Sequence, residues 1–238
     1  MVRTSISILV VATAILVTKT ARADCVVLLH GLARTANSMS DIEDAFRERG
    51  FEVVNVDYPS REKRVEDLSV QAIQSGLEGC SAGCDEKIHF VTHSMGGILV
   101  RYYLAGHTIQ NLGRVVMLAP PNNGSEVVDN MGDVPAFGFV NGPAGLQLGT
   151  GPDGIPSQLG AVTYPVGIIA GTRTINPILS QYLPNPDDGK VSVESTKVEG
   201  MADFVSLPVS HPFIVRDKEA IRQAIAFIET GAFIDESP

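Results

Sequence analysis

The sequence predicts an α/β protein with one parallel sheet of about six strands and helices on both faces of the sheet. Short apolar segments alternate along the chain with longer segments of helical periodicity, and this alternation is typical of parallel strands joined by right-handed crossovers. The strand segments are apolar almost throughout, as expected for strands buried on both faces. The length of 238 residues suits a single domain with a sizeable core.

The individual elements follow from local patterns. Strands are expected where apolar runs are short, at residues 25–30, 51–56, 87–92, 114–119, 165–170 and 204–207. Helices are expected at residues 40–49, 65–78, 95–105 and 218–230. The first helix begins at a capping box formed by Ser40 and Glu43 and stops at Gly50, whereas the last is followed by Gly231.

The first 23 residues have the layout of a secretory signal peptide. Arg3 precedes an apolar run over residues 5–17, and the segment ends in Ala21-Arg22-Ala23. The apolar run is shorter than the roughly 20 residues that a membrane-spanning helix needs, so an uncleaved anchor is the less favoured alternative. We therefore expect a mature chain, residues 24–238, that is exported to the periplasm or the extracellular space and keeps no stable membrane anchor.

The charge balance excludes some partners. The whole chain has 18 Lys and Arg against 27 Asp and Glu, a net charge of −9. Residues 1–23 hold three of the basic residues and no acid, so the mature chain has a net charge of −12. Nucleic acids and anionic membrane surfaces are bound through basic patches, and we expect no nucleic-acid partner.

Three cysteines remain in the mature chain, and export favours one disulfide with one thiol left over. Cys80 and Cys84 are the nearest pair in sequence, in a Gly-rich loop. Cys25 and Cys84 compete with them, because both would lie at the N-terminal ends of strands that could be neighbours. The pairing therefore stays open. A zinc site at Cys80 and Cys84 is less favoured, since no histidine has suitable spacing nearby.

One segment breaks the alternation of strands and helices. Residues 122–161 are rich in Gly and Pro and too long for an ordinary connection. They form either an irregular surface loop or, as we favour, a cap over a site at the carboxyl ends of the strands, where open α/β sheets bind ligands. No Lys or Arg occurs from residue 115 to residue 172, which argues against an anionic substrate.

A serine stands at the junction of the third predicted strand and the following helix, in the run His-Ser-Met-Gly-Gly at 93–97. A sharp turn there raises the Ser94 side chain above the sheet edge, at a helix N-terminus that favours developing negative charge. The turn needs small residues two positions before and two positions after the serine. Gly96 meets the second requirement, and Thr92 approximates the first.

This stretch resembles the nucleophile elbow of the α/β-hydrolase family, and within that family the chain resembles the compact bacterial lipases and esterases. The resemblance covers nearly all of the mature chain and also rests on CVVLLHGL at 25–32, LAPPNNGSE at 118–126, PNPDDGKVSVEST at 184–196 and PVSHPFI at 208–214. There are two departures. Thr92 replaces the first glycine of the elbow, and the family's usual N-terminal pair of antiparallel strands is missing, which implies a reduced sheet.

The resemblance implies a catalytic triad of Ser94 as nucleophile, His211 as general base and Asp188 as the acid that orients the base. The Asp-Gly pair selects Asp188 over its neighbour Asp187. Asp57 is interpreted as a solvated loop acid.

Other residues receive secondary roles. The backbone N–H groups of Leu32 and Met95 are the expected oxyanion hole. Arg34 either braces the oxyanion loop or lies on the surface, and Arg101 is expected on the surface or in a structural ion pair. Four more histidines are interpreted as structural: His30, His89, His93 and His107.

The sequence thus predicts an exported serine carboxylic-ester hydrolase, a lipase or esterase that cleaves apolar acyl esters or lipids through an acyl-Ser94 intermediate. We expect no cofactor and no metal. An acyltransferase, thioesterase or amidase is the alternative, because these enzymes share the acyl-enzyme half-reaction. A binding protein that has lost catalysis is disfavoured by the complete triad.

Overall fold

Six strands form one sheet in which every neighbouring pair is parallel, in the order β2-β1-β3-β4-β5-β6. The structure is a computed structural model and describes residues 23–81 and 86–235, so the expected signal peptide lies outside the described residues except for Ala23. The strands are β1 (Cys25–Leu29), β2 (Glu52–Val56), β3 (Ile88–His93), β4 (Leu112–Leu118), β5 (Val166–Gly171) and β6 (Asp203–Leu207). The prediction of about six parallel strands is confirmed.

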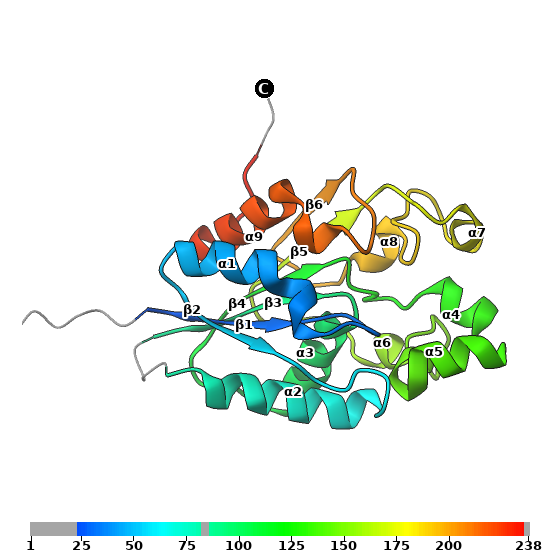
Figure 1. Cartoon of the computed structure of the whole chain (residues 1–238), viewed down its shortest axis with the longest axis horizontal. Coiled ribbons are helices and arrows are strands. Elements are labelled where there is room, and N and C mark those ends of the chain that lie inside the picture. Colours follow the sequence, from blue (N-terminus) through cyan, green and yellow to red (C-terminus); the bar gives the residue numbers. More distant parts are fainter. Residues whose placement is uncertain (1–22, 82–85, 236–238) are drawn as a thin grey trace, which may run out of the picture.

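Helices cover both faces of the sheet, as predicted. In Figure 1, α1 (Ser40–Glu48) and α9 (Lys218–Thr230) lie on one face, and α2 (Val65–Gly79) and α3 (Met95–Gly106) lie on the other. No helix in the described part of the chain is long and apolar enough to cross a membrane.

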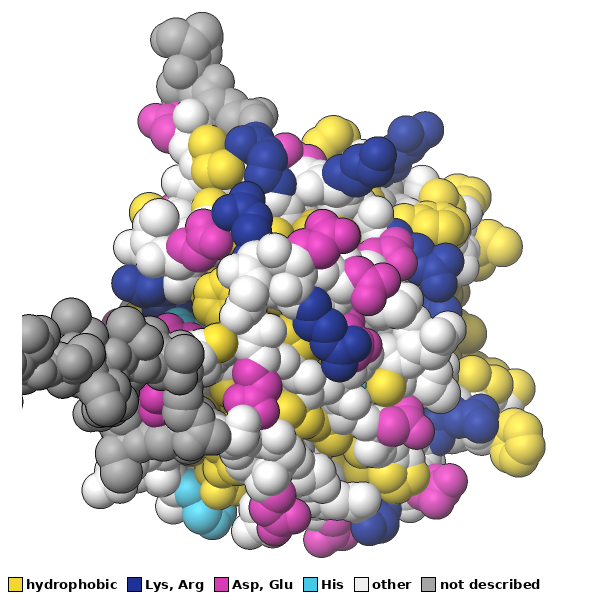
Figure 2. All heavy atoms as spheres, turned by 60° about the vertical axis from the view of Figure 1, so that its left-hand side comes forward, with side chains coloured by type: hydrophobic (Ala, Val, Ile, Leu, Met, Phe, Trp, Pro, Cys, Tyr) yellow, Lys and Arg dark blue, Asp and Glu magenta, His cyan; other side chains and the backbone are white. Residues whose placement is uncertain are grey.

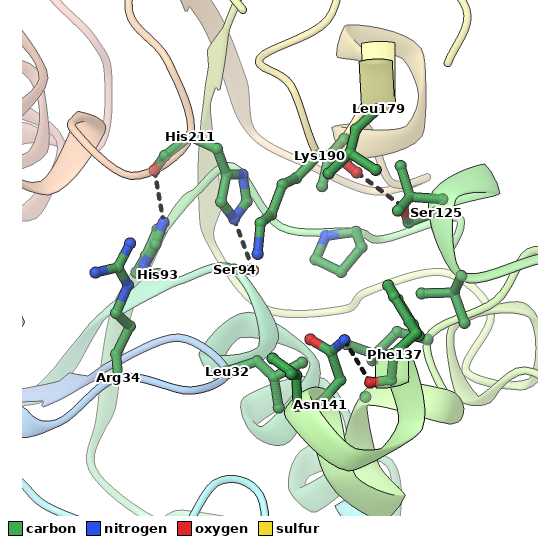
Figure 3. A pocket seen from close by; sticks show the side chains of 17 residues that line it. Leu32, Arg34, His93, Ser94, Ser125, Phe137, Asn141, Leu179, Lys190 and His211 are labelled. Carbon is green, nitrogen blue, oxygen red and sulfur yellow. Dashed lines mark hydrogen bonds between the residues drawn. The ribbon is translucent and has the colours of Figure 1, made fainter. Parts of the chain in front are cut away.

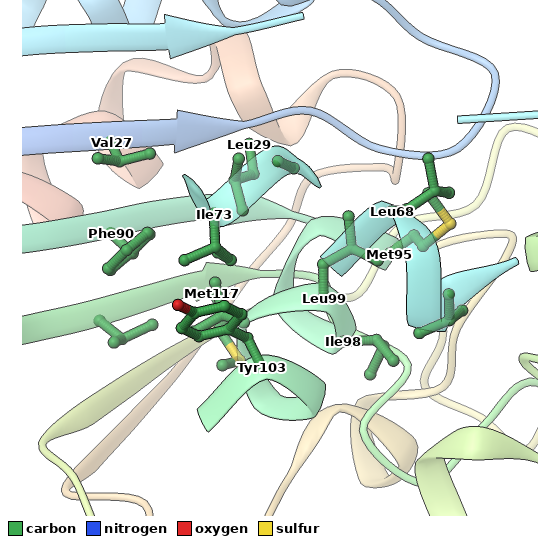
Figure 4. Packing of buried hydrophobic residues seen from close by; sticks show 14 of the residues in the cluster. Val27, Leu29, Leu68, Ile73, Phe90, Met95, Ile98, Leu99, Tyr103 and Met117 are labelled. Atoms are coloured by element: carbon green, nitrogen blue, oxygen red, sulfur yellow. The ribbon is translucent and has the colours of Figure 1, made fainter. Parts of the chain in front are cut away.

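The core is divided into two layers by the alternation of side chains along the strands. In β1, Val27 and Leu29 pack toward α2 and α3 (Figure 4), whereas Val26 and Leu28 pack toward α1 and α9. All five residues of β1 are completely buried. The strand can be apolar throughout because each of its faces is covered by helices.

The start of α1 differs from the prediction. A 3-10 turn, η1 (Ala36–Met39), leads directly into the helix, so Ser40 is the first helical residue and Met39 occupies the cap position. The Ser40 hydroxyl contacts Asp41 and caps no backbone N–H. The capping-box prediction is therefore wrong, because η1 continues the helical path by one turn at the N-terminus.

The Gly- and Pro-rich residues 122–161 contain three helices of their own: α4 (Glu126–Met131), α5 (Pro135–Leu146) and α6 (Ile155–Gln158). Together with α7 (Pro177–Ser180) and α8 (Val193–Thr196), they gather at the carboxyl ends of the strands (Figure 1). Residues 122–161 thus lie beside the edge of the sheet at which parallel α/β proteins hold their sites.

Arg101 of α3 is hydrogen-bonded to both ends of residues 122–161. Its guanidinium donates hydrogen bonds to the carbonyl oxygens of Asn122 and Gly160, each at 2.7 Å. The side chain is buried and forms no ion pair with any residue described by the structure. The expectation of a surface or ion-pair role for Arg101 is wrong, because α3 is enclosed by the core and its polar side chain bonds to backbone carbonyls instead.

One disulfide joins Cys25, at the start of β1, to Cys80, directly after α2. Because α2 runs back across the sheet, its C-terminal end returns to the edge where β1 begins. One bridge was expected with its partners left open, and the bridge formed is neither of the two pairings considered, Cys80–Cys84 and Cys25–Cys84. Cys84 lies outside the described residues.

Candidate active site

The site lies where the chain leaves two neighbouring strands toward opposite faces of the sheet. After β1 the chain passes to α1 on one face, and after β3 it passes to α3 on the other. Such a reversal opens a crevice at the carboxyl ends of the two strands. Gly31 and Leu32 follow β1 at this crevice, and Ser94 follows β3.

Ser94 occupies a strained turn between β3 and α3. Its φ of 52° and ψ of −122° lie in a region that non-glycine residues rarely adopt. The turn brings the backbone so close to β1 that a Cβ atom at Gly96 would stand 2.6 Å from the carbonyl oxygen of Leu29. Thr92, by contrast, fits where the elbow pattern has a glycine, and its buried hydroxyl donates to the carbonyl oxygen of Val116 at 3.3 Å.

The three predicted triad residues come together from distant parts of the sequence. His211 Nε2 lies 3.0 Å from Ser94 Oγ, and His211 Nδ1 lies 2.7 Å from Asp188 Oδ2. The other carboxylate oxygen of Asp188 accepts hydrogen bonds from the backbone N–H groups of Lys190 and Val191, at 2.9 and 2.8 Å. A carboxylate at Nδ1 selects the tautomer protonated there, which leaves Nε2 free to accept the serine proton.

Asp187 and Asp57, the other two aspartates considered as the acid of the triad, form their hydrogen bonds with residues other than His211. Asp187 accepts hydrogen bonds from the Ser180 hydroxyl at 2.6 Å and from the Gly189 N–H at 2.7 Å. The Asp57 side chain is 68% exposed and accepts from the N–H of Ala36. Of the three aspartates weighed, the structure brings only Asp188 to the imidazole of His211.

The predicted oxyanion donors flank the serine. Met95 is the first residue of α3, so its N–H has no acceptor within the helix. Within residues 23–81 and 86–235, neither the Met95 N–H nor the Leu32 N–H donates to another residue. Both amides therefore remain available to an oxygen bound beside Ser94.

His30 braces the loop that carries Leu32. The Tyr58 N–H donates to His30 Nε2 at 3.3 Å, and His30 Nδ1 donates to the carbonyl oxygen of Gly31 at 2.9 Å. The two rings stack with centroids 3.9 Å apart, and the Tyr58 hydroxyl donates to the His30 carbonyl oxygen. Burial lowers the pKa of His30, so the neutral ring that this network requires is favoured.

His93, interpreted from the sequence as structural, contacts the backbone of the predicted base. Its Nε2 donates to the backbone carbonyl oxygen of His211 at 3.0 Å, and the two rings lie 4.9 Å apart. Burial, followed by the charge of His211, holds the pKa of His93 well below its usual value. No sequence signal indicates this contact, because the two residues are far apart in the chain and only the fold brings them together.

A cavity of about 250 Å³ opens beside Ser94. Apolar side chains form much of its wall (Figure 3): Leu32, Val128, Phe137, Val140, Leu148 and Leu179. Those from α4 and α5 show that the segment 122–161 contributes directly to the cavity, and Leu179 comes from α7. Among the described residues, no group of three or more His, Cys, Asp or Glu could hold a metal ion.

Two basic residues, Arg34 and Lys190, also line this cavity. Lys190 is exposed as a whole residue, yet the pKa of its amine is lowered, first by burial and then by the charge of Arg34, while Asp188 acts to raise it. No role for Lys190 is predicted from the sequence. Its position directly after the Asp-Gly pair is the one signal that would have placed it near the site.

The chain belongs to the α/β-hydrolase family, because the sequence model described as "Alpha/beta hydrolase family" matches residues 26–220. The resemblance noted in the sequence is thereby confirmed at the level of the family. No curated protein matches the chain at a significant level of similarity.

Solved structures of similar fold include several lipases and esterases. The mature form of lipase BlEst2 from Bacillus licheniformis has a TM-score of 0.67 at 15% identity, over 90% of this chain and 94% of that one. The metagenomic carboxyl esterase MGS0156 has a TM-score of 0.68 at 16% identity, over 82% and 66% of the two chains. Phospholipase PlaB from Legionella pneumophila has a TM-score of 0.63 at 20% identity, over 86% and 57%. At such identities the likeness is one of fold.

Proposed function

We propose that the protein is a serine carboxylic-ester hydrolase, a lipase or esterase that works through an acyl-Ser94 intermediate. One observation carries the proposal: a continuous chain of hydrogen bonds, from Ser94 Oγ through His211 to Asp188, ends at an apolar cavity. Membership of the α/β-hydrolase family and the fold shared with lipases and esterases support it.

The reaction follows from the positions of the proton carriers. Ser94 Oγ attacks the ester carbonyl carbon while its proton passes to His211 Nε2, and Asp188 stabilises the resulting imidazolium. The N–H groups of Leu32 and Met95 hold the oxyanion of the tetrahedral intermediate. As the C–O bond breaks, the imidazolium gives its proton to the departing alcohol. Water then attacks the acyl-serine, His211 takes one of its protons, and the carboxylic acid leaves as Ser94 is reprotonated.

The cavity favours an apolar acyl group. Alkyl chains gain about 25 cal/mol for each Å² of apolar surface removed from water, and the helices of residues 122–161 supply much of the apolar wall. We assign this segment the role of a cap. Phe139 of α5 and Ile178 of α7 are 87% and 69% exposed, and such exposed apolar side chains support contact with an apolar substrate.

Export is part of the proposal. The layout of residues 1–23 supports removal as a signal peptide, and the Cys25–Cys80 disulfide is typical of an oxidising compartment. Expression in a secreting host followed by N-terminal sequencing should give a chain that begins at Asp24.

A fluorophosphonate probe and an ester series test the activity. Wild type should be labelled and should hydrolyse 4-nitrophenyl esters, whereas Ser94→Ala should do neither. An unlabelled wild type would contradict a serine hydrolase of any kind. A labelled wild type that turned over no ester, from acetate to palmitate, would contradict ester hydrolysis and favour the acyltransferase, thioesterase or amidase alternative.

A further inference from the structure

The cavity beside Ser94 has a positively charged side. Arg34, in the loop after β1, and Lys190, in the loop that carries Asp188, are both part of its lining. Among the described residues that line this cavity, none is Asp or Glu. This is unexpected in a chain in which 27 acidic residues outnumber 18 basic ones.

Arg34 lies apart from much of the apolar wall, whereas Lys190 reaches Ser94 from the side of Leu179 and Ser125. Figure 3 shows the Lys190 amine directed toward Ser94, and Arg34 on the side of Ser94 away from Phe137 and Leu179. A substrate whose ester carbon lies at Ser94 would therefore meet an apolar wall in one direction and positive charge in the other.

Arg34 and Lys190 have no ion-pair partner among the described side chains. The Asp188 carboxylate attracts Lys190, but its oxygens are already bonded to His211 and to two backbone amides. On the side drawn in Figure 2, by contrast, basic and acidic side chains are interspersed. Two cations without a counter-ion attract an anion.

A second cavity extends this charged side. Its volume is about 180 Å³, and it shares Arg34 and His93 with the first cavity. It adds the guanidinium of Arg216, and its described lining also contains no carboxylate. Arg34 thus stands between the two cavities.

We propose that the substrates are esters whose alcohol portion carries an anionic group, a carboxylate or a phosphate, and that Arg34 and Lys190 bind this group. The inference rests on the proposed ester hydrolysis and names its substrate class. The acyl chain takes the apolar side, so the alcohol portion extends toward Arg34, with Arg216 further along. A guanidinium matches the two oxygens of either anion in a bidentate manner, and an ammonium acts as a point charge.

The sequence argued against an anionic substrate because residues 115–172 contain no Lys or Arg. That observation holds for the segment but not for the site. Arg34 and Lys190 lie outside it in sequence and reach the cavity through the loops that follow β1 and carry Asp188. The segment supplies apolar wall, and the charge comes from elsewhere.

Matched pairs of esters test the inference on the purified protein. The first pair is 3-carboxy-4-nitrophenyl butyrate and its neutral carboxamide analogue; the second is 1-butyrylglycerol 3-phosphate and 1-butyrylglycerol. The measured quantity is the ratio of kcat/KM for the anionic ester to kcat/KM for the neutral ester. It is determined for wild type, Arg34→Gln, Lys190→Gln and the double variant. Lys87→Gln, which removes one exposed cation just before β3 at the opposite edge of the sheet, is the charge-matched control.

The ratio should exceed one in wild type and in Lys87→Gln for at least one pair, and the pair with the larger ratio identifies the anion. Each of Arg34→Gln and Lys190→Gln should lower that ratio about tenfold, the usual effect of one hydrogen bond to a charged group. Raised salt should lower it as well. Equal or lower efficiency for both anionic esters would overturn the inference, as would ratios that the two substitutions leave unchanged. Failure to hydrolyse any of the four esters, together with no fluorophosphonate labelling, would instead contradict the proposed function.

Discussion

The Nε2 of His93 donates a hydrogen bond to the backbone carbonyl oxygen of His211 at 3.0 Å. The residue before the proposed nucleophile therefore holds the main chain that carries the proposed base. Because Ser94 Oγ lies 3.0 Å from the ring of His211, a small displacement of this backbone would lengthen the path of the proton. His93 is a positioning residue in this arrangement.

Loss of the His93 donor should lower kcat with little change in KM. His93→Phe keeps a planar ring but leaves the carbonyl of His211 without a donor, and we expect a decrease of about tenfold, near the net value of one buried hydrogen bond. His93→Gln can place an amide N–H near the position of Nε2 and should recover most of the rate. Steady-state kinetics on a 4-nitrophenyl ester measures both constants. Equal losses in the two variants would show that packing alone matters at this position.

The two adjacent aspartates should differ sharply in their effect on catalysis. Asp188→Asn removes the carboxylate that holds His211 in its reactive tautomer, and kcat should fall by about 10⁴-fold. Asp187→Asn keeps an oxygen for the Gly189 N–H and an amide for Ser180, so its kcat should change by less than about tenfold. Similar activities in the two variants would contradict the assignment of Asp188.

The folded protein should lose stability as the pH falls below about 6.5. Burial is the first cause that lowers the pKa of His30, His89 and His93. Between the lowered pKa of each ring and the ordinary value of 6.5, the unfolded chain binds a proton that the folded chain does not. The unfolding free energy therefore decreases as the pH falls through this window, and the contribution of the three neutral rings is complete above about pH 6.5.

Denaturant unfolding at pH 7.5, 6.5 and 5.5 checks this prediction. The carboxylates with lowered pKa, Glu66 and Glu219, contribute only near and below their ordinary value of 4.5, so they do not interfere. His89→Phe removes one of the three imidazoles and should make the unfolding free energy depend less steeply on pH. An unfolding free energy that stayed constant or rose from pH 6.5 to 5.5 would contradict it.

The Cys25–Cys80 disulfide should contribute substantially to stability. It closes a loop between residues 55 positions apart, and chain-entropy estimates give about 4 kcal/mol for a loop of this size. Cys80→Ser should lower the unfolding free energy by roughly this amount, whereas Cys84→Ser should not. Peptide mapping without reduction should recover Cys25 linked to Cys80. A linkage of either residue to Cys84 would contradict the pairing.

The sequence predicted the sheet well because each strand is marked by its own local pattern. The apolar runs of β1, β3 and β5 correspond to strands that are buried at every position. Ser94, Asp188 and His211 could also be predicted, since Ser94 and His211 lie in short motifs soon after β3 and β6 and Asp188 is marked by an Asp-Gly pair.

Features that depend on the tertiary arrangement could not be predicted from the sequence. The helix α5 contains glycines and a proline and includes a kink at Gly142, so local propensity gives little sign of it. The partner of Cys25 depends on the path of α2, and the contacts of Arg101 depend on where the two ends of residues 122–161 lie. The charged side of the cavity is formed by Arg34 and Lys190, which only the fold brings together.

The residue that a fluorophosphonate modifies identifies the nucleophile directly. The reagent should add to Ser94, so tandem mass spectrometry should find the phosphonyl group on the peptide that contains residues 93–97. Ser125 also lines the cavity but lacks a histidine base within the described contacts, and it should remain unmodified. An adduct on Ser125 or on any residue other than Ser94, or no adduct at all, would show that Ser94 is not the nucleophile.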